Sequence, residues 1–124
     1  MKTNQKGIIS LDWGAIWDIL SIFDVKIEES SGGNVIKNLE NYYELSCEIR
    51  SQIGEEFYKV INSKEYKELY LANKKTFKKI EEVQKSNGLA KQVDGLNYKR
   101  FLKKCALQKK YFGGNISEVK LGYK

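Results

Sequence analysis

The sequence predicts an all-α fold, a helical bundle or a set of antiparallel helical hairpins with about four helices and an extended C-terminal tail. Three observations lead to this prediction. The 124 residues contain no proline, the residue that most strongly interrupts a helix interior. Apolar residues recur every three or four positions, the spacing that lines one face of an α-helix. Segments rich in Gly, Ser and Asn separate these periodic stretches.

The first helix is expected to begin after Ser10, which can cap its N-terminus, and to run to about Ser30. Five large apolar side chains are spaced three or four positions apart and share one face of this segment, namely Trp13, Ile16, Leu20, Phe23 and Ile27. Trp17, Ile19 and Ile22 widen that face. We therefore expect this helix to be central, with its tryptophans in the core rather than in a ligand site.

A second helix is expected from Val35 towards Ile61. The turn before it contains Gly32-Gly33, and Asn34 is placed to cap the helix that follows. Gly54 lies inside this segment and weakens a helix by about 1 kcal/mol relative to Ala. A bend or an early end is therefore expected at Gly54.

A third helix is expected to begin after Asn62-Ser63, which offers a cap, and to continue to about Ser86. Asn87-Gly88 then closes it, because glycine readily takes the left-handed conformation that ends helices. A fourth helix should run from about Leu89 or Asp94 to Phe112, where Gly113-Gly114 stops it. We expect residues 1–124 to form a single helical domain with extended termini at residues 1–9 and 115–124.

Missing residue types restrict the chemistry. The chain has no histidine, which removes the usual general base at neutral pH and the commonest metal ligand. Cys47 and Cys105 are its only cysteines and lack the close spacing of a zinc site, so we expect unbridged, reduced thiols, no metal and no cofactor. No segment approaches the roughly 20 apolar residues that span a bilayer. We place the protein in the cytoplasm, with no membrane partner.

Charge is unevenly distributed along the chain. Residues 1–63 contain six Lys or Arg and ten Asp or Glu, whereas residues 64–124 contain sixteen and six. The two halves therefore attract each other. This asymmetry favours intramolecular packing, head-to-tail association of copies, or an acidic partner for the basic half such as nucleic acid.

Four short segments resemble a known family. Residues 18–26 read Asp-Ile-Leu-Ser-Ile-Phe-Asp-Val-Lys, residues 71–75 read Leu-Ala-Asn-Lys-Lys before Phe77, residues 96–100 read Leu-Asn-Tyr-Lys-Arg, and residues 118–120 read Glu-Val-Lys before Tyr123. In this order they resemble short, uncharacterised bacterial and phage proteins that open with Asp-Lys/Arg-Leu-Ser-Ile-Leu-Glu-Ile-Lys and later carry Val-Asn, Leu-Asn-x-x-Arg and Glu-Lys-Ser-Tyr. The resemblance implies an all-helical fold and no particular activity. The chain departs from the pattern at Ile19, where the family has a basic residue, so any role of that residue does not carry over.

Asp18 lies between Trp17 and Ile19 on the most apolar helix. Burying a lone carboxylate is costly unless it is paired, and Arg100, one of only two arginines, is our candidate partner. A fold-specifying buried pair is one interpretation; a solvent-exposed Asp18 or a functional carboxylate are the others. The candidate polar cluster comprises Asp18, Lys26, Asn73, Asn97 and Arg100. Its two asparagines, inside expected helices, indicate interhelical hydrogen bonds or a shared ligand site.

Lysines recur in pairs four positions apart, so that several fall on one helix face. The candidate anion-binding residues are Lys74, Lys75, Lys78, Lys79, Lys103 and Lys104. They can contact phosphates, or they can form an ordinary solvated face. No helix-turn-helix, zinc-finger or RNA-binding motif supports the former.

Three functional classes follow from these observations. The first is a structural or protein-interaction domain whose partner is another protein or a second copy of itself, which would make it a homo-oligomer. The second is a basic nucleic-acid-binding module. The third is a small helical enzyme that holds an anionic substrate with Arg and Lys, with catalytic residues that the sequence does not identify.

Overall fold

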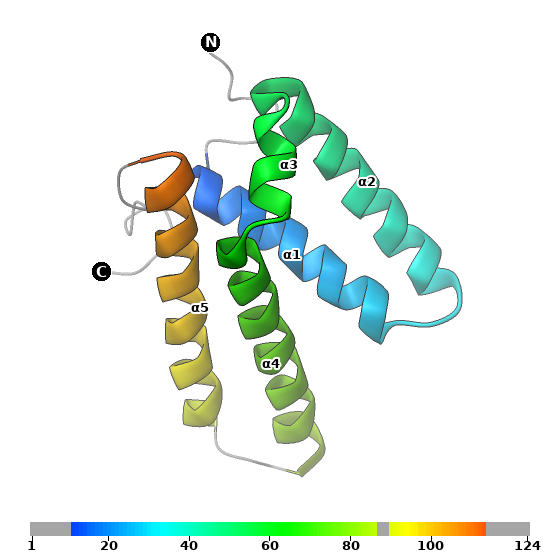
Figure 1. Ribbon diagram of the computed structural model, residues 1–124. Helices are drawn as coiled ribbons and strands as arrows, with labels where there is room; N and C mark the ends of the chain where they lie inside the picture. The colour runs from blue at the N-terminus through cyan, green and yellow to red at the C-terminus, as the bar shows by residue number, and fades with distance from the viewer. Residues whose placement is uncertain (1–10, 87–89, 114–124) are drawn as a thin grey trace.

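The computed structural model describes residues 11–86 and 90–113, which form helices and no strand (Figure 1). The helices are α1 (Trp13–Glu29), α2 (Gly33–Ile53), α3 (Glu56–Ile61), α4 (Lys64–Ser86) and α5 (Ala90–Tyr111). The all-α prediction is confirmed. The expected extended termini and the Asn87-Gly88 closure lie outside the described residues.

Helix α1 runs through the middle of the bundle and packs against α2, α4 and α5. The α4–α5 hairpin covers one side of α1, and α2 lies on the other side, with short α3 leading from α2 to α4 (Figure 1). The central position expected for α1 is therefore confirmed. The first half of the chain therefore meets the second half mainly where α1 packs against α4 and α5.

The core is centred on Trp17, which is fully buried. Its ring packs against Phe57 and Tyr66, with centroids 5.4 and 5.7 Å away. Ile16 and Leu20 are also buried, as predicted for the α1 stripe. Trp13, Phe23 and Ile27 are only half-buried. Helices α4 and α5 cover the face of α1 that carries Trp17, Ser21 and Val25 rather than the face that carries these three residues.

Two predicted N-terminal caps, Ser10 and Asn34, are not confirmed. Ser10 lies outside the described residues. Asp12 is at the N-cap position of α1 and makes no side-chain cap, and the Gly14 N–H in the first turn donates across the bundle to Gln108 Oε1 at 2.7 Å. The cap predicted at Asn34 is wrong: α2 already begins at Gly33, without a side-chain cap. The chain can turn one residue earlier because Gly32 takes φ 65°.

Other helix ends match the predictions. Ser63 Oγ accepts a hydrogen bond from the Tyr66 N–H at 3.0 Å and caps α4. Gly54, with φ 61°, ends α2 early, so the single long helix expected here is two helices. At the end of α5 the Gly113 N–H donates to the Gln108 carbonyl at 2.8 Å, which confirms the glycine stop.

Both cysteines, Cys47 and Cys105, are free, as expected, and both are half-buried. None of the helices in the described part of the chain is long and apolar enough to cross a membrane. The basic half of the sequence forms the α4–α5 hairpin, and the acidic half forms α1 to α3. The charge asymmetry of the sequence is thus also a spatial one.

Two leucines of α4 test the assignment of the core. Leu69 is fully buried and Leu71 is 50% exposed. We expect Leu69→Ala to lower the free energy of unfolding by about 2–5 kcal/mol, because it leaves a cavity. Leu71→Ala, the matched control, should change it by less than about 0.5 kcal/mol. Urea denaturation would contradict the fold if the two variants lost similar stability.

Candidate functional site

The polar cluster is built around Asp18, whose side chain is 8% exposed on the face of α1 towards α4 and α5. Arg100 of α5 donates from Nη2 to Asp18 Oδ2 at 2.9 Å. The ion pair predicted between these two helices is therefore confirmed. A carboxylate in this apolar setting requires such a partner, because ionised oxygens lose their hydration when they are buried.

Asn73 of α4 connects a third helix to this carboxylate. Its Nδ2 donates to Asp18 Oδ1 at 2.8 Å and lies 2.5 Å from Ser21 Oγ. Ser21 Oγ in turn donates to the Asp18 carbonyl at 2.8 Å. Three helices thus meet through one carboxylate, each contact made by a buried or half-buried polar group.

Arg100 is oriented from within its own helix. Its Nη1 donates to Asn97 Oδ1 at 2.9 Å, three positions earlier on the same face of α5. Asn97 therefore positions the guanidinium rather than contacting Asp18 itself. The structure brings together four of the five residues of the candidate polar cluster, namely Asp18, Asn73, Asn97 and Arg100.

Lys26 is not part of this group. It follows Asp18 by eight positions, about 12 Å along the helix axis, and its side chain is exposed near the turn between α1 and α2. A further lysine takes its place near the carboxylate. Lys104 is buried, and its Nζ lies 3.8 Å from Asp18 Oδ2. The signal in the sequence was its spacing of four from Arg100, which puts both cations on one face of α5.

The cluster carries one carboxylate and two cations away from bulk water. Burial lowers the pKa of the Lys104 ammonium, the nearby Asp18 carboxylate opposes that change, and Arg100 adds to it. Beside the cluster, Asn73, Thr76 and Arg100 meet apolar residues around a hollow of about 130 Å³. Ligand pockets are usually about 300–1,000 Å³, so the arrangement fits a structural connection between helices better than a substrate site.

The candidate anion-binding lysines are divided between different surroundings. Lys74, Lys78, Lys79 and Lys103 face carboxylates of Glu28, Glu29, Glu82 and Glu68 at 2.7, 4.0, 2.9 and 3.3 Å. Lys104 is buried beside Asp18, and Lys75 of α4 lines the space between α4 and α5. The six residues therefore do not form one continuous cationic face.

Comparisons with models of protein families, with curated proteins and with solved structures find no match to this chain. The resemblance of its short segments to bacterial and phage proteins stays a prediction.

A double-mutant cycle tests the ion pair. Asp18→Asn should cost about 3–5 kcal/mol of unfolding free energy, because it leaves buried cations without their carboxylate. Arg100→Met should cost less, since Lys104 stays within 3.8 Å of Asp18 Oδ2. The double variant should lose less than the sum of the two. Additive losses below about 1 kcal/mol in chemical denaturation would show that the pair behaves as an exposed one.

The lowered pKa of Lys104 predicts a pH dependence. Between that lowered pKa and the 10.5 of an exposed lysine, the unfolded chain binds more protons, so stability at this site rises with pH. The unfolding free energy of Lys104→Met minus that of the wild type should therefore decrease from pH 7 to pH 10. Groups shared by both proteins cancel in this difference. A difference that increases with pH would contradict the assignment.

Proposed function

We propose that the protein is a helical interaction domain that associates with a second copy of itself through the outer face of α2. The observation that carries this proposal is a row of large apolar side chains left in solvent. Ile36, Leu39 and Tyr43 are 63%, 48% and 66% exposed. They are three and four positions apart and so share one side of the helix. We call these three residues the outer stripe.

The packing of α2 supports the proposal. Of its 21 residues only Ser46 and Ile49 are buried, and neither belongs to the N-terminal half. Most of the stability of a helix in a protein comes from tertiary packing of an apolar face rather than from intrinsic propensity. Tyr42 and Leu45 pack against the core, and a second copy placed on the outer stripe would cover the side of residues 33–45 that their own bundle leaves in solvent.

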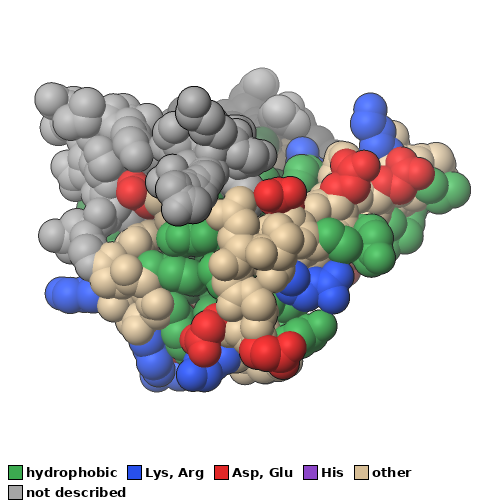
Figure 2. Space-filling model, turned by 90° about the horizontal axis from the view of Figure 1, so that it is seen from above, with side chains coloured by type: hydrophobic (Ala, Val, Ile, Leu, Met, Phe, Trp, Pro, Cys, Tyr) green, Lys and Arg blue, Asp and Glu red, His purple; other side chains and the backbone are tan. Residues whose placement is uncertain are grey.

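The surface has the composition of a docking face. In the view from above, the projecting end of the α1–α2 hairpin carries apolar side chains next to acidic and basic ones (Figure 2). Single exposed apolar residues are ordinary, whereas a contiguous group bordered by charges is typical of interaction sites. The buried polar cluster would then serve to fix the frame on which α2 is presented.

Two tyrosines of similar exposure test this function. Tyr43→Arg, on the outer stripe, should weaken self-association at least tenfold in sedimentation velocity, because it puts a charge in the apolar centre of the contact. Tyr98→Arg, on α5 and 61% exposed in the wild type, is the matched control and should associate as the wild type does. The proposal fails if the wild type stays monomeric up to the highest soluble concentration, or if both variants associate normally.

A further inference from the structure

A second uncovered surface lies on the other side of the bundle. A groove of about 290 Å³ runs between α4 and α5, and its lining residues are Glu68, Leu71, Ala72, Lys75, Leu96, Lys99 and Lys103. Its apolar part comes from both helices, and Leu71 is 50% exposed there. The groove is therefore open and apolar at its centre, with charged side chains around it.

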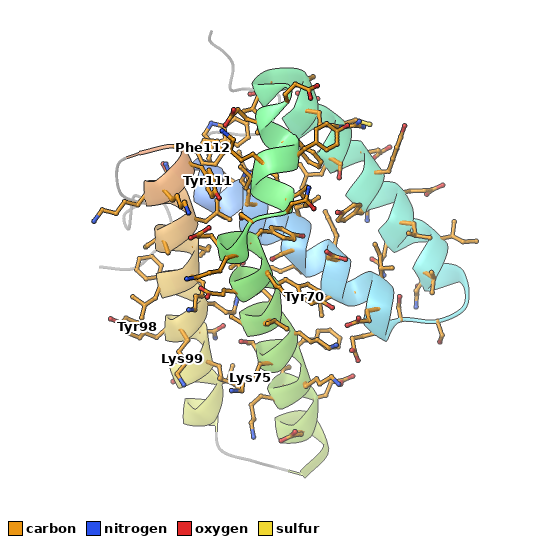
Figure 3. The ribbon with its side chains drawn as sticks, in the orientation of Figure 1. Tyr70, Lys75, Tyr98, Lys99, Tyr111 and Phe112 are labelled. Carbon is orange, nitrogen blue, oxygen red and sulfur yellow. The ribbon has the colours of Figure 1, made fainter. Side chains whose placement is uncertain are left out.

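The charges around the groove are mainly positive. Lys103 Nζ lies 3.3 Å from a Glu68 oxygen, so these two partly neutralise each other. Lys75 and Lys99 form no ion pair with any residue in the described part of the chain. Both side chains line the groove between α4 and α5 (Figure 3). The groove thus offers two lysines to an acidic, partly apolar partner.

The outer stripe of α2 has the complementary character. Glu40 follows Ile36 by four positions and precedes Tyr43 by three, so it borders the stripe directly. Glu44 follows Glu40 by one helical turn and continues this acidic border. Both glutamates are exposed, and so is Lys37 three positions before Glu40, so the border has a net negative charge. An apolar row with an acidic border on α2 therefore matches an apolar groove with a basic border on α4 and α5.

We infer that the outer stripe of one copy docks in the α4–α5 groove of the next, so that the copies associate head to tail. This inference rests on the proposed self-association and names the surface that receives α2. Helix α2, which carries the stripe, and the α4–α5 hairpin, which carries the groove, lie on opposite sides of α1 (Figure 1). A copy that donates its stripe therefore keeps its groove open, and such contacts continue into a ring or a filament.

Charge favours this arrangement over a symmetric one. Contact between two α2 helices would bring together two borders that each carry Glu40, Glu44 and one lysine, Lys37, and an excess of like charge across an interface opposes association. Docking in the groove instead places them near Lys75 and Lys99. The apolar centre of the groove, formed by leucines rather than by exposed aromatic rings, also favours a protein helix over the bases of a single-stranded nucleic acid.

Mixing two blocked variants tests the inference. Tyr43→Arg blocks the stripe and leaves the groove intact, whereas the double variant Lys75→Glu with Lys99→Glu blocks the groove and leaves the stripe intact. Each should be monomeric alone in sedimentation velocity. Mixed in equal amounts, they should form a 1:1 dimer and nothing larger, because one intact stripe meets one intact groove.

A control and a rescue accompany this experiment. Lys64→Glu with Lys109→Glu makes the same change in net charge at exposed positions outside the groove, and it should associate as the wild type does. Adding Glu40→Lys and Glu44→Lys to the groove variant should restore self-association of a single chain, since both borders then change sign. Association of the wild type should weaken as salt is raised.

The possible failures are distinguishable. If the groove variant associates as well as the wild type while Tyr43→Arg does not, the contact is symmetric; the inference is overturned and the proposed function stands. If the wild type never associates, both are overturned. A monomeric wild type that binds a labelled single-stranded RNA oligonucleotide, with at least tenfold loss in the groove variant, would assign the groove to nucleic acid and would also overturn the inference.

Discussion

The arrangement of the bundle depends on neutralising one carboxylate. Asp18 lies on an apolar helix, where an isolated charge is strongly unfavourable. Its two carboxylate oxygens accept hydrogen bonds from Asn73 of α4 and Arg100 of α5, and the Lys104 ammonium lies nearby. Because these groups come from different helices, the register and rotation of α1 relative to the α4–α5 hairpin are restricted together. Apolar packing around Trp17 supplies stability, and the polar contacts select one arrangement among those that such packing allows.

The packing of α1 leaves much of α2 exposed to solvent. Helix α1 contacts α2 as extensively as α4, but only Ser46 and Ile49 of α2 become buried. Its apolar row at Ile36, Leu39 and Tyr43 consequently faces solvent. An acidic border on that side and a basic groove on the other give the molecule two complementary surfaces, which is the physical basis of the association proposed above.

Much of this structure could be predicted from the sequence, and the exceptions have physical reasons. The helices follow from the spacing of apolar residues, and the partner of Asp18 follows from the cost of burying a charge when only two arginines are present. The burial of Lys104 was missed although its spacing of four from Arg100 was visible, because paired lysines at that spacing also resemble a solvated face. The exposure of the outer stripe was equally hidden, since apolar periodicity is the same whether the covering surface belongs to one chain or two. The prediction that Asn34 caps α2 was wrong because Gly32 turns the chain and α2 begins at Gly33, before Asn34.

We infer that α1, α4 and α5 form a fixed frame and that α2 is completed by another copy. Hydrogen–deuterium exchange at low and high protein concentration tests this most directly. Amides around Asp18 in α1 should keep the same strong protection at both concentrations, whereas amides of residues 33–45 in α2 should be weakly protected when dilute and gain protection as concentration rises. Exchange in residues 33–45 that is as slow as in α1 at low concentration, and unchanged at high concentration, would contradict this inference.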